Sequence, residues 1–548
     1  MLRVTGIDLP LDHSETDLKK AVAKKLQVAP GKLLDVTVYK ESIDARGRRG
    51  GVGLTLVVDV GLADEDGVLR RFEGRESLVS KVPDGGYKPP VGGGVGAGGG
   101  RPVIIGSGPA GLFCGLALAR AGLRPIMLER GKAVGERARD VTGFWNRGWS
   151  LNQESNVQFG EGGAGTFSDG KLYTQIRDRE GRIRWILEVL VAAGAPEDIL
   201  WKGRPHIGTD RLIRVVRTLR EEIAALGGDV RFESKVTGLT VDAGAVRGVE
   251  VNGGESGVDA REVIVAIGHS ARDTFRMLRD AGVVFEPKGF SMGVRIEHPQ
   301  RVIDMAQYGK SAGHERLGAA PYKFVQKASN GRKAYSFCMC PGGLVVAASS
   351  EEGGVVTNGM SSYSRAEANA NSGVMVEVGL GEIAAMTGID PSEDSLAGLD
   401  FQRYWEAKAF ELGGSNYRAP VQLVGDFLAG KGSKKLGEVV PSYKPGVVPG
   451  DLSECLPGYV AETIRGAIPG ISRRLRGFSM EGAVLVGVET RSSSPVRMTR
   501  GEENLESLSV KGVFPAGEGA GYAGGIISAA ADGLKVAERV IGSRVSGS

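Results

Sequence analysis

The hydrophobic pattern of the first domain, residues 1–84, alternates between strand and helix. Residues 2–11 form a strand-like run, and the Ser-x-x-Asp spelling that begins at Ser14 is typical of a capped helix. Residues 33–45 and 52–63 follow as two more strand-like runs, joined by a basic turn that contains glycine. This β-α-β-β order predicts half or more of a ferredoxin-like sandwich.

The basic turn, residues 45–51, has two interpretations. One is a contact to RNA. Against it, residues 1–84 contain 14 basic and 14 acidic residues, and their predicted strands carry no aromatic pair on which bases could stack. We therefore favour a structural or docking module, which would dock either a partner or the same chain.

Residues 85–100 are rich in Gly and Pro, which predicts a linker between domains. Gly94, Gly96 and Gly99 spell Gly-x-Gly-x-x-Gly inside it. No strand precedes this spelling and no amphipathic helix begins in it, so we expect no nucleotide site there.

The same spelling recurs at residue 106 in a context that gives it meaning. An apolar strand over residues 103–105 precedes it, a helix over 112–121 follows, and a second strand ends at Glu129, 18 residues after Gly111. Such a β-α-β unit binds the pyrophosphate of a dinucleotide at the helix start and its ribose at the acid. The predicted cofactor contacts here are Gly106, Gly108, Pro109, Ala110, Gly111, Glu129 and Arg130.

The carboxyl end distinguishes FAD from NAD. Residues 513–514 form a strand, Gly517-Glu518-Gly519 a turn, and a helix begins at about Ile526. Only 24 residues follow Gly524, too few for a second complete nucleotide fold. The segment resembles the carboxyl-terminal motif of FAD oxidoreductases, with Glu518 in place of the customary Asp. By this resemblance, the cofactor contacts are Gly517, Glu518, Gly525 and Ile526.

A third segment resembles FAD proteins of the glutathione-reductase class. The hydrophobic pattern predicts a helix capped by Asp210, then a three-stranded meander, then an apolar strand that ends at Ala266-Ile267-Gly268. By this resemblance, Val236 would contact the adenine through its backbone. The turn at Gly268 would replace the Ala-Thr-Gly of that class.

The resemblance extends over nearly the whole chain. Residues 152–172, 336–361, 491–498 and 516–533 are similar to uncharacterised FAD-dependent dehydrogenases that carry a small amino-terminal α/β domain. It implies FAD and an oxidoreductase, but no particular substrate. The predicted fold class is α/β, with a Rossmann-like FAD-binding domain, an inserted mixed α+β substrate domain and a small ferredoxin-like domain. The predicted domain limits are 1–84, linker 85–100, FAD-binding 101–290, inserted substrate domain 291–500 and FAD-binding 501–548. Within the inserted domain we expect mixed strands and an Ala/Glu-rich helical stretch from residue 364 onward.

The loop over residues 156–172 is expected to lie beside the cofactor. Gly162, Gly163 and Gly165 would bring backbone amides close to it. Ser168 and Lys171 could meet a phosphate or the N1/O2 edge of the flavin, where positive charge favours the reduced anion. A solvated turn is the alternative.

The sequence supports candidate catalytic residues less strongly than it supports the cofactor contacts. Cys338 and Cys340 invite a redox interpretation, but Cys-x-Cys would close a strained disulfide ring, and a buried strand end is the alternative. His269 follows the Gly268 turn directly, with a structural role as its alternative. Arg491, together with Ser493 and Arg497, could hold an anionic substrate or tie two domains together.

Composition narrows the function. The 69 Lys and Arg residues against 65 Asp and Glu give a net charge of +4, which provides no electrostatic footprint for nucleic acid. Four cysteines are too few for a disulfide scaffold, and no ligand set has metal-like spacing. No apolar run of 18 residues and no secretory signal is present, so we expect a soluble cytoplasmic protein, or an organelle protein whose targeting peptide has been removed.

Together these patterns predict an FAD-dependent oxidoreductase that transfers a hydride between the flavin and a small or hydrophobic organic substrate, which they do not identify. No second nucleotide domain is visible, so if NAD(P)H is the electron donor, it must bind transiently over the face of the flavin. The alternatives are an NAD(P)H-dependent flavin monooxygenase and a non-catalytic flavin-binding adaptor.

Overall fold

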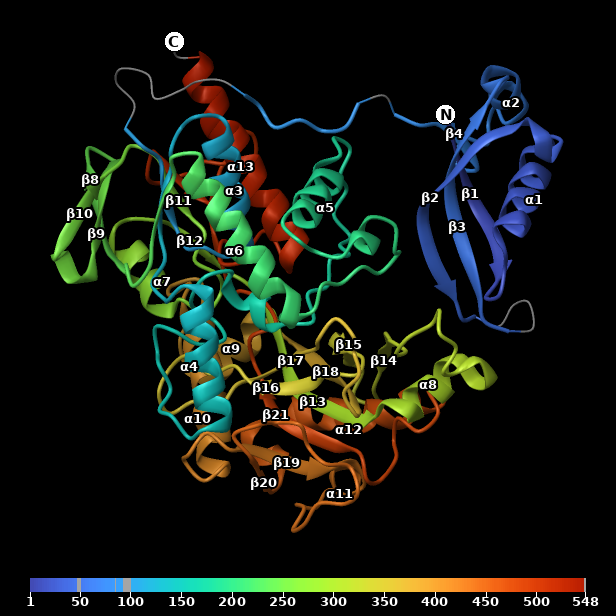
Figure 1. Cartoon of the computed structure of the whole chain (residues 1–548). Coiled ribbons are helices and arrows are strands. Elements are labelled where there is room, and N and C mark those ends of the chain that lie inside the picture. Colours follow the sequence, from blue (N-terminus) through green and yellow to red (C-terminus); the bar gives the residue numbers. More distant parts are fainter. Residues whose placement is uncertain (47–50, 84, 92–99, 547–548) are drawn as a thin grey trace.

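The computed structural model describes residues 1–46, 51–83, 85–91 and 100–546. Most of the basic turn and the linker spelling at Gly94, Gly96 and Gly99 lie outside the described residues. Figure 1 shows the small amino-terminal domain in blue, a nucleotide-binding domain that joins the cyan and green segments to the red carboxyl-terminal helix, and a second domain in yellow and orange.

The amino-terminal domain is a complete ferredoxin-like sandwich. Its antiparallel sheet has the order β2-β3-β1-β4, and the first helix is closed by reciprocal hydrogen bonds between Ser14 and Asp17, as predicted. Two elements beyond the predicted four, a short helix and a short edge strand, complete the fold. The elements are β1 (Leu2–Pro10), α1 (Glu15–Leu26), β2 (Leu33–Asp44), β3 (Gly53–Leu62), α2 (Glu65–Arg71) and β4 (Val79–Lys81).

The nucleotide-binding domain contains a five-stranded parallel sheet in the order β23-β11-β5-β6-β7. Because the strands are parallel, their carboxyl ends meet at one edge, where ligands bind in such folds. The strands are β5 (Val103–Ile105), β6 (Ile126–Leu128), β7 (Asp229–Arg231), β11 (Val263–Val265) and β23 (Val513–Pro515). The predicted meander is present as β8 (Val236–Asp242), β9 (Ala245–Val251) and β10 (Ser256–Asp259).

Helices cover this sheet, and the first packs closely against the last. A Cβ atom on Gly533 would overlap the carbonyl oxygen of Ala110, so the approach of the two helices depends on this glycine. The helices are α3 (Pro109–Arg120), α5 (Arg182–Ala192), α6 (Thr209–Ala225), α7 (Arg272–Asp280) and α13 (Ile526–Ser546). Helix α4 (Val134–Asn146) instead packs against the second domain, whose hydrophobic cluster includes its Val141 and Trp145 (Figure 1).

The predicted cap of the helix near residue 210 is wrong. Helix α6 begins at Thr209 with Gly208 as its N-cap, and Asp210 lies in the first turn. The Asp210 carboxylate accepts a hydrogen bond from the backbone amide of Tyr363 instead. A long-range contact has therefore replaced a local one.

The second domain is built on a seven-stranded mixed sheet in the order β14-β15-β18-β13-β21-β19-β20. Its strands are β13 (Phe290–Pro299), β14 (Val325–Lys327), β15 (Lys333–Cys340), β18 (Asn369–Val378), β19 (Ala419–Leu423), β20 (Val447–Pro449) and β21 (Val484–Glu489). Smaller pairs are β12 (Phe285–Pro287) with β22 (Val496–Met498), and β16 (Leu344–Ala347) with β17 (Thr357–Met360). The helices are α8 (Gln300–Tyr308), α9 (Leu380–Thr387), α10 (Ala397–Leu412), α11 (Val424–Leu428) and α12 (Gly458–Ser472).

The expected helical stretch from residue 364 onward is also wrong. Asn369–Val378 is strand β18, which lies between β15 and β13 and is buried at nine of its ten positions. A strand that is covered on both faces has no polar alternation, and its packing overrides the helix preference of Ala and Glu.

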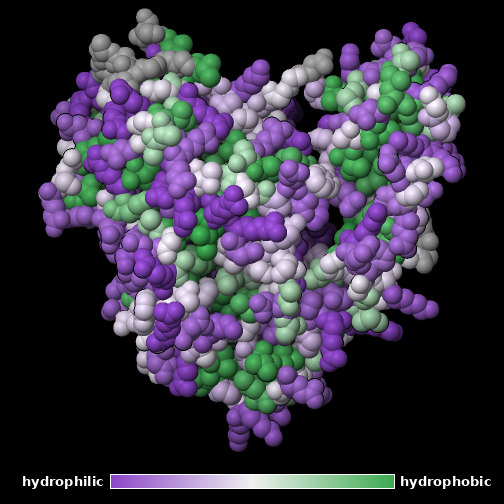
Figure 2. Space-filling view, in the orientation of Figure 1, coloured by the Kyte–Doolittle hydropathy of each residue, from purple (hydrophilic) through white to green (hydrophobic). Residues whose placement is uncertain are grey.

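Short 3-10 turns join the larger elements: Pro30–Lys32, Gly163–Phe167, Glu197–Leu200, Asn252–Gly254, Gly309–Ser311 and Leu452–Cys455. Figure 2 shows that hydrophilic residues cover much of the visible face, with hydrophobic residues in scattered patches. Across the described part of the chain, no helix combines the length and the apolar character that crossing a membrane requires.

Candidate functional site

A cavity of about 240 Å³ lies at the carboxyl edge of the parallel sheet, and residues of the second domain line its other side. The nucleotide-binding side contributes the glycine turns that follow β5, β11 and β23. The second domain contributes Phe337, Cys338, Cys340, Asn358, Gly359, Arg491 and Ser492. Of the predicted contacts, those that line this cavity are Gly106, Gly108, Pro109, Ala110, Glu129, Arg130, Gly163, Lys171, Val236, Gly268, Glu518, Gly525 and Ile526.

The three glycines of the first turn differ in what surrounds them. Gly106 has a φ of +100°, and a Cβ atom there would lie 2.5 Å from the Ala266 carbonyl oxygen. A Cβ on Gly111 would overlap the Gly106 carbonyl oxygen, so this glycine serves helix packing and does not line the cavity. A Cβ on Gly108 would come no closer than 3.8 Å, to the Gly163 Cα, so the space there faces the cavity. Helix α3 starts beside it and directs its positive end there.

Glu129 is buried and holds two loops in place. Its carboxylate accepts hydrogen bonds from the Ser107 amide at 2.9 Å, the Ser107 hydroxyl at 2.7 Å, the Gly131 amide at 2.9 Å and the Gly160 amide at 3.0 Å. A carboxylate has about four acceptor positions, so the protein itself occupies all of them. Its predicted contact to a ribose stays a prediction.

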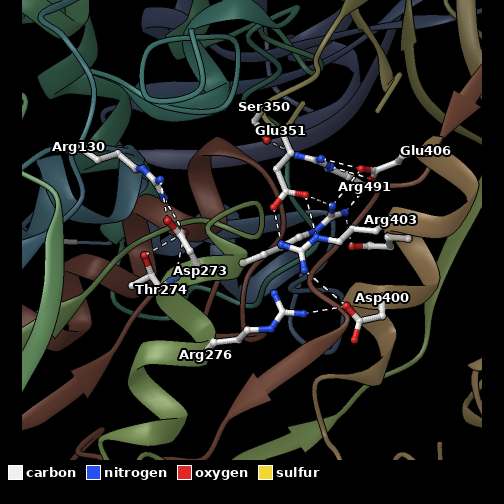
Figure 3. Close-up of polar contacts among 12 residues, drawn as sticks. Arg130, Asp273, Thr274, Arg276, Ser350, Glu351, Asp400, Arg403, Glu406 and Arg491 are labelled. Carbon is white, nitrogen blue, oxygen red and sulfur yellow. Dashed lines mark hydrogen bonds and ion pairs between the residues drawn. The ribbon is translucent and has the colours of Figure 1, made fainter. Parts of the chain in front are cut away.

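Arg130 lies at the same end of the cavity within a cluster of charges. It forms a bidentate pair with Asp273, at 2.8 and 2.9 Å (Figure 3). It also donates a hydrogen bond of 2.6 Å to Glu154. Lys235 contacts the same two carboxylates at 2.7 and 2.9 Å. Burial would raise the pKa of Asp273, but Arg130 and Lys235 outweigh it and hold that pKa well below its usual range.

The predicted loop is fixed from beneath by Arg137, a fully buried arginine. Its guanidinium donates hydrogen bonds to four carbonyl oxygens, those of Asn156, Val157, Gly160 and Glu161. Gly163 lines the cavity, as do Gly165 and Ser168. Gly162 does not, since a Cβ atom there would overlap the Thr166 hydroxyl.

Lys171 reaches the part of the cavity where the two domains meet. Its Nζ lies 3.2 Å from Asp169 Oδ2 and 3.7 Å from Cys340 Sγ. Burial would lower the pKa of Lys171, but the charge of Asp169 outweighs it and raises that pKa, so the ammonium stays protonated. Asp169 also forms a bidentate pair with Arg365.

Cys338 and Cys340 are free thiols in the cavity wall. Cys338 has a φ of +40°, in the left-handed region that favours glycine, at a bulge where strand β15 breaks its register with β18. Burial raises the pKa of Cys340. Cys338 is exposed to the cavity, but the surrounding protein desolvates its thiol and raises its pKa to about 11 despite the nearby Lys171 and Arg295. Both residues are therefore thiols at neutral pH.

Arg491 lines the cavity and is bound firmly to the protein. Its guanidinium donates to Glu406 at 3.0 and 2.8 Å and to the Ser350 hydroxyl at 2.6 Å. The same Glu406, which Figure 3 shows beside Arg491, also binds Arg272 at the start of α7, so the cluster joins the two domains. Arg497 does not line the cavity and lies 3.9 Å from Glu286.

The second glycine-rich turn completes the wall. The Gly517 amide donates to Asp532 at 2.8 Å and does not line the cavity. His269 does line it, next to Glu518. The sequence reasoning missed Gln158 and Ser270, which are joined by a hydrogen bond of 3.0 Å in the cavity wall. Their only signal was their position, in or beside predicted cofactor loops.

Comparisons with known proteins agree with this geometry. Family models match residues 289–492, described as FAD-dependent protein, C-terminal domain-like, residues 100–277, described as pyridine nucleotide-disulphide oxidoreductase, and residues 1–60, described as a domain of unknown function. A protein of Clostridium beijerinckii, described as uncharacterised, is 45% identical over 541 residues, 98% of each chain. The chain belongs to this family of FAD-dependent proteins.

Among solved structures there are distant likenesses in fold. A mutant of the halogenase PltM in complex with FAD is 11% identical, over 82% of this chain and 70% of that one, with a TM-score of 0.38. Glycine oxidase from Bacillus cereus is 12% identical, over 81% of this chain and 95% of that one, with a TM-score of 0.31. CtdE in complex with FAD is 14% identical, over 81% and 84%, with a TM-score of 0.31.

The cavity of this FAD-dependent protein fits its cofactor on two observations. The open approach at Gly108, beside the start of α3, suits a pyrophosphate. The buried Nε2 atom of His269 has no hydrogen-bond partner within the described ranges, as expected of a polar atom whose partner is a ligand. The chain is therefore a flavoenzyme that uses FAD.

Proposed function

We propose that this flavoenzyme transfers a hydride between FAD and a small organic substrate held by the second domain. One observation carries the proposal: a single cavity joins the dinucleotide-binding turns at Gly108 and Gly268 to second-domain residues such as Cys338 and Arg491. A cofactor that enters from the first side leaves the second side for a reacting partner. Bound FAD supplies the two-electron chemistry, and the protein supplies position and electrostatics.

The charges at the second-domain side support a substrate with an anionic group. Lys171 and Arg365 carry two positive charges, and Asp169 between them carries one negative charge. Burial would raise the pKa of Asp169, but Lys171 and Arg365 outweigh it and hold that pKa well below its usual range. One positive charge is therefore left in excess beside the cavity. The nearby His206 adds none, because burial lowers its pKa to about 4 and keeps it neutral. Lys171 would therefore bind a substrate carboxylate or the anionic edge of the reduced flavin.

The fixed side chains support a closed reaction site. Arg491 is held by Glu406 and Ser350, and Gln158 is held by Ser270. Protein groups therefore fix the positions of these polar side chains. A rigid wall lowers the reorganisation needed during the reaction. The thiols of Cys338 and Cys340 border the site as neutral groups.

The test is anaerobic reduction of the FAD-loaded protein by NADH and NADPH in a stopped-flow instrument, followed by mixing with small unsaturated or 2-oxo carboxylic acids and their neutral methyl esters. We expect reoxidation by one or more acids and at least about tenfold slower reoxidation by the matching esters, the loss of a charge-assisted contact. Lys171→Met should remove this preference, whereas Lys202→Met, outside the cavity, should keep it.

Three results would contradict the proposal. Reoxidation only by oxygen, with a hydroxylated product, would identify a monooxygenase. Failure of every donor and acceptor with full FAD occupancy would favour a non-catalytic flavin-binding protein. Equal rates for acids and esters would remove the anionic substrate class.

A further inference from the structure

The turn after β11 and the turn after β23 pack against each other in the cavity wall. A Cβ atom on Gly519 would overlap the carbonyl oxygen of Gly268, so glycine is needed for this approach. The contact places His269 beside Glu518, with 3.4 Å between Nδ1 and Oε1. Both residues line the FAD cavity.

The length of the Glu518 side chain matters for this pair. One carboxylate oxygen reaches His269, and the other lies 3.5 Å from the amide of Gly525, which also lines the cavity. The related motif has Asp at this position, and Asp is shorter by one carbon–carbon bond of about 1.5 Å. An Asp here could keep the acid near the turn but would lose its reach to the imidazole.

The two nitrogens of His269 have different surroundings. Nδ1 faces the carboxylate, which favours the tautomer with its proton on Nδ1. Nε2 is left as the acceptor, buried and without a hydrogen-bond partner in the part of the chain that the structure describes. The ring is therefore oriented, with one nitrogen available to exchange a proton.

We propose that His269 and Glu518 form a proton-handling pair in the FAD cavity, with His269 Nε2 as the proton acceptor and Glu518 as its positioning residue. This rests on the proposed hydride transfer and adds the path of the proton. As the substrate C–H bond breaks and its hydrogen leaves with the electron pair to FAD, an adjoining O–H or N–H bond breaks, its proton passes to Nε2, and a C=O or C=N bond forms. In the reverse direction the imidazolium returns the proton.

Other charged groups act on the pair through Glu518. Lys288, in the turn between β12 and β13, acts on Glu518, and Arg497, on β22, acts in turn on Lys288. Burial would raise the pKa of Glu518, but the contact to His269, the Gly525 amide and Lys288 together lower it. Burial and the charge of Arg497 lower the pKa of Lys288. Glu518 is thus ionised and can stabilise a positive ring.

The experiment is a redox titration of the FAD-loaded protein with dithionite at a series of pH values from about 5.5 to 9, around the ordinary pKa of histidine. A group that takes up a proton when the cofactor is reduced produces a break in the plot of midpoint potential against pH. We expect this break in the wild type and in His314→Gln, whose histidine lies outside the cavity. We expect its loss in His269→Gln, which keeps a polar side chain but cannot titrate.

Glu518→Asp and Glu518→Gln test the positioning role. Both should bind FAD and change the position of the break along the pH axis, because the imidazole loses the carboxylate that orients it. A second readout needs no cofactor: the nitrogen-15 NMR titration of His269 should move in the same direction in both variants.

The results separate the two proposals. An unchanged break in His269→Gln, or wild-type behaviour of Glu518→Asp in both readouts, would overturn the proton-handling pair. If FAD is lost from His269→Gln, the NMR shift in Glu518→Asp still decides. A break that depends on His269 in a protein that no organic donor or acceptor can oxidise or reduce would overturn the proposed hydride transfer and leave the pair intact.

Discussion

Gly108 is the position where cofactor binding can be tested apart from folding. A Cβ atom there would lie 3.8 Å from the nearest protein atom, an ordinary van der Waals contact, but would enter the expected path of the pyrophosphate. We expect Gly108→Val to fold with a melting temperature close to that of the wild type and to bind FAD at least about 100-fold more weakly, a loss of about 2.7 kcal/mol. The FAD content, from absorbance near ~450 nm of the purified protein, provides the measurement.

Gly111 supplies the contrasting variant. A Cβ atom there overlaps the Gly106 carbonyl oxygen, so Gly111→Val should destabilise the whole helix-turn contact and reduce the amount of folded protein. Full FAD occupancy in Gly108→Val would show that the pyrophosphate does not approach this turn.

Cys338 should react slowly despite its exposure in the cavity. Its pKa is raised to about 11, so the reactive thiolate is scarce at pH 7.5. We expect its rate of alkylation by iodoacetamide to be about 100-fold below that of an ordinary cysteine at pH 7.5 and to keep rising with pH to above pH 10. Mass spectrometry of the labelled peptide measures the rate, with Cys338→Ser as the control for assignment. A plateau below pH 9 would contradict the prediction.

Single residues of the site differ in how far the sequence could reveal them. The residues around Gly108 belong to a short glycine motif, and the strand and helix that identify it are adjacent to it in the sequence. Lys171 and Cys340 are separated by 169 positions, and only the packing of two domains brings them within 3.7 Å. The pairing of Glu518 with His269 depends on such packing too, which is why the unusual acid had no explanation in the sequence.

Helix α7 and helix α10 meet through a buried cluster of charges around Glu406. Its carboxylate accepts two hydrogen bonds from Arg272, two from Arg491 and one from the Thr490 hydroxyl. Two buried cations share this acid, so its loss would leave both without their main partner. The cluster therefore fixes the wall of the cavity where the domains join.

Glu406→Gln should destabilise the protein by about 3–5 kcal/mol, because the neutral amide turns a donor toward a guanidinium. Glu411→Gln is the matched control on the same helix, since that acid is 63% exposed and pairs only with Lys408 among the described residues. Its effect should stay below about 0.5 kcal/mol. Urea unfolding of both variants provides the comparison, and equal effects would contradict the role of the cluster.

The same cluster should make the stability of the fold depend on pH in the acidic range. Burial would raise the pKa values of Glu351 and Glu406, but their charged partners outweigh it. Arg403 and Arg272 lower the pKa of Glu351 to about 2, and Arg272 and Arg491 hold that of Glu406 well below its usual range. Carboxylates with lowered pKa values stabilise the fold above their ordinary value of 4.5 and lose that contribution as the pH falls. We expect the wild-type melting temperature to decrease from pH 5 downward, and less steeply in Glu406→Gln. A parallel decrease in both proteins would contradict this source.

Elements with a local signal were predictable, and elements set by packing were not. The strands of the parallel sheet and of the meander could be predicted from apolar runs and turns that are visible in the sequence. Strand β18 does not, because its Asn, Ala and Ser residues fill the centre of a sheet that is covered on both faces. Asp210 likewise has the residue type of a cap, but the chain enters α6 through Gly208 and gives that carboxylate to Tyr363.

Over the whole molecule, the amino-terminal domain contacts both other parts of the chain. Leu11 and Leu54 belong to the hydrophobic cluster of the second domain, and His314 contacts Asp12 at 3.0 Å. On the nucleotide-binding side, the Glu41 amide donates to the Trp201 carbonyl at 2.7 Å, and the Gly203 amide donates to the Glu41 carbonyl at 2.6 Å. The edge of β2 is thereby paired with residues 201–203.

The paired segment continues toward the cavity. Four residues after Lys202, His206 forms a bridge with Lys171, and the Leu172 amide donates to the Pro205 carbonyl at 2.9 Å. Residues 201–207 therefore have the amino-terminal domain at one end and a cavity-lining lysine at the other. Backbone pairing of this kind holds both neighbours in register.

Gly203 allows this docking to be removed by one substitution. A Cβ atom there would overlap the Ser42 hydroxyl and lie 2.9 Å from the Glu41 carbonyl oxygen, whereas a Cβ on Gly31 would meet no atom within 4 Å. We expect Gly203→Val to separate the domain, which increases the radius of gyration in small-angle X-ray scattering, and Gly31→Val to leave it docked. Amide hydrogen exchange should then accelerate over residues 201–207 and 170–172, because both segments lose a fixed neighbour. Acceleration confined to 201–203 would show that docking does not extend to Lys171, and an unchanged radius would show that the domain is held mainly by the apolar contacts of Leu11 and Leu54.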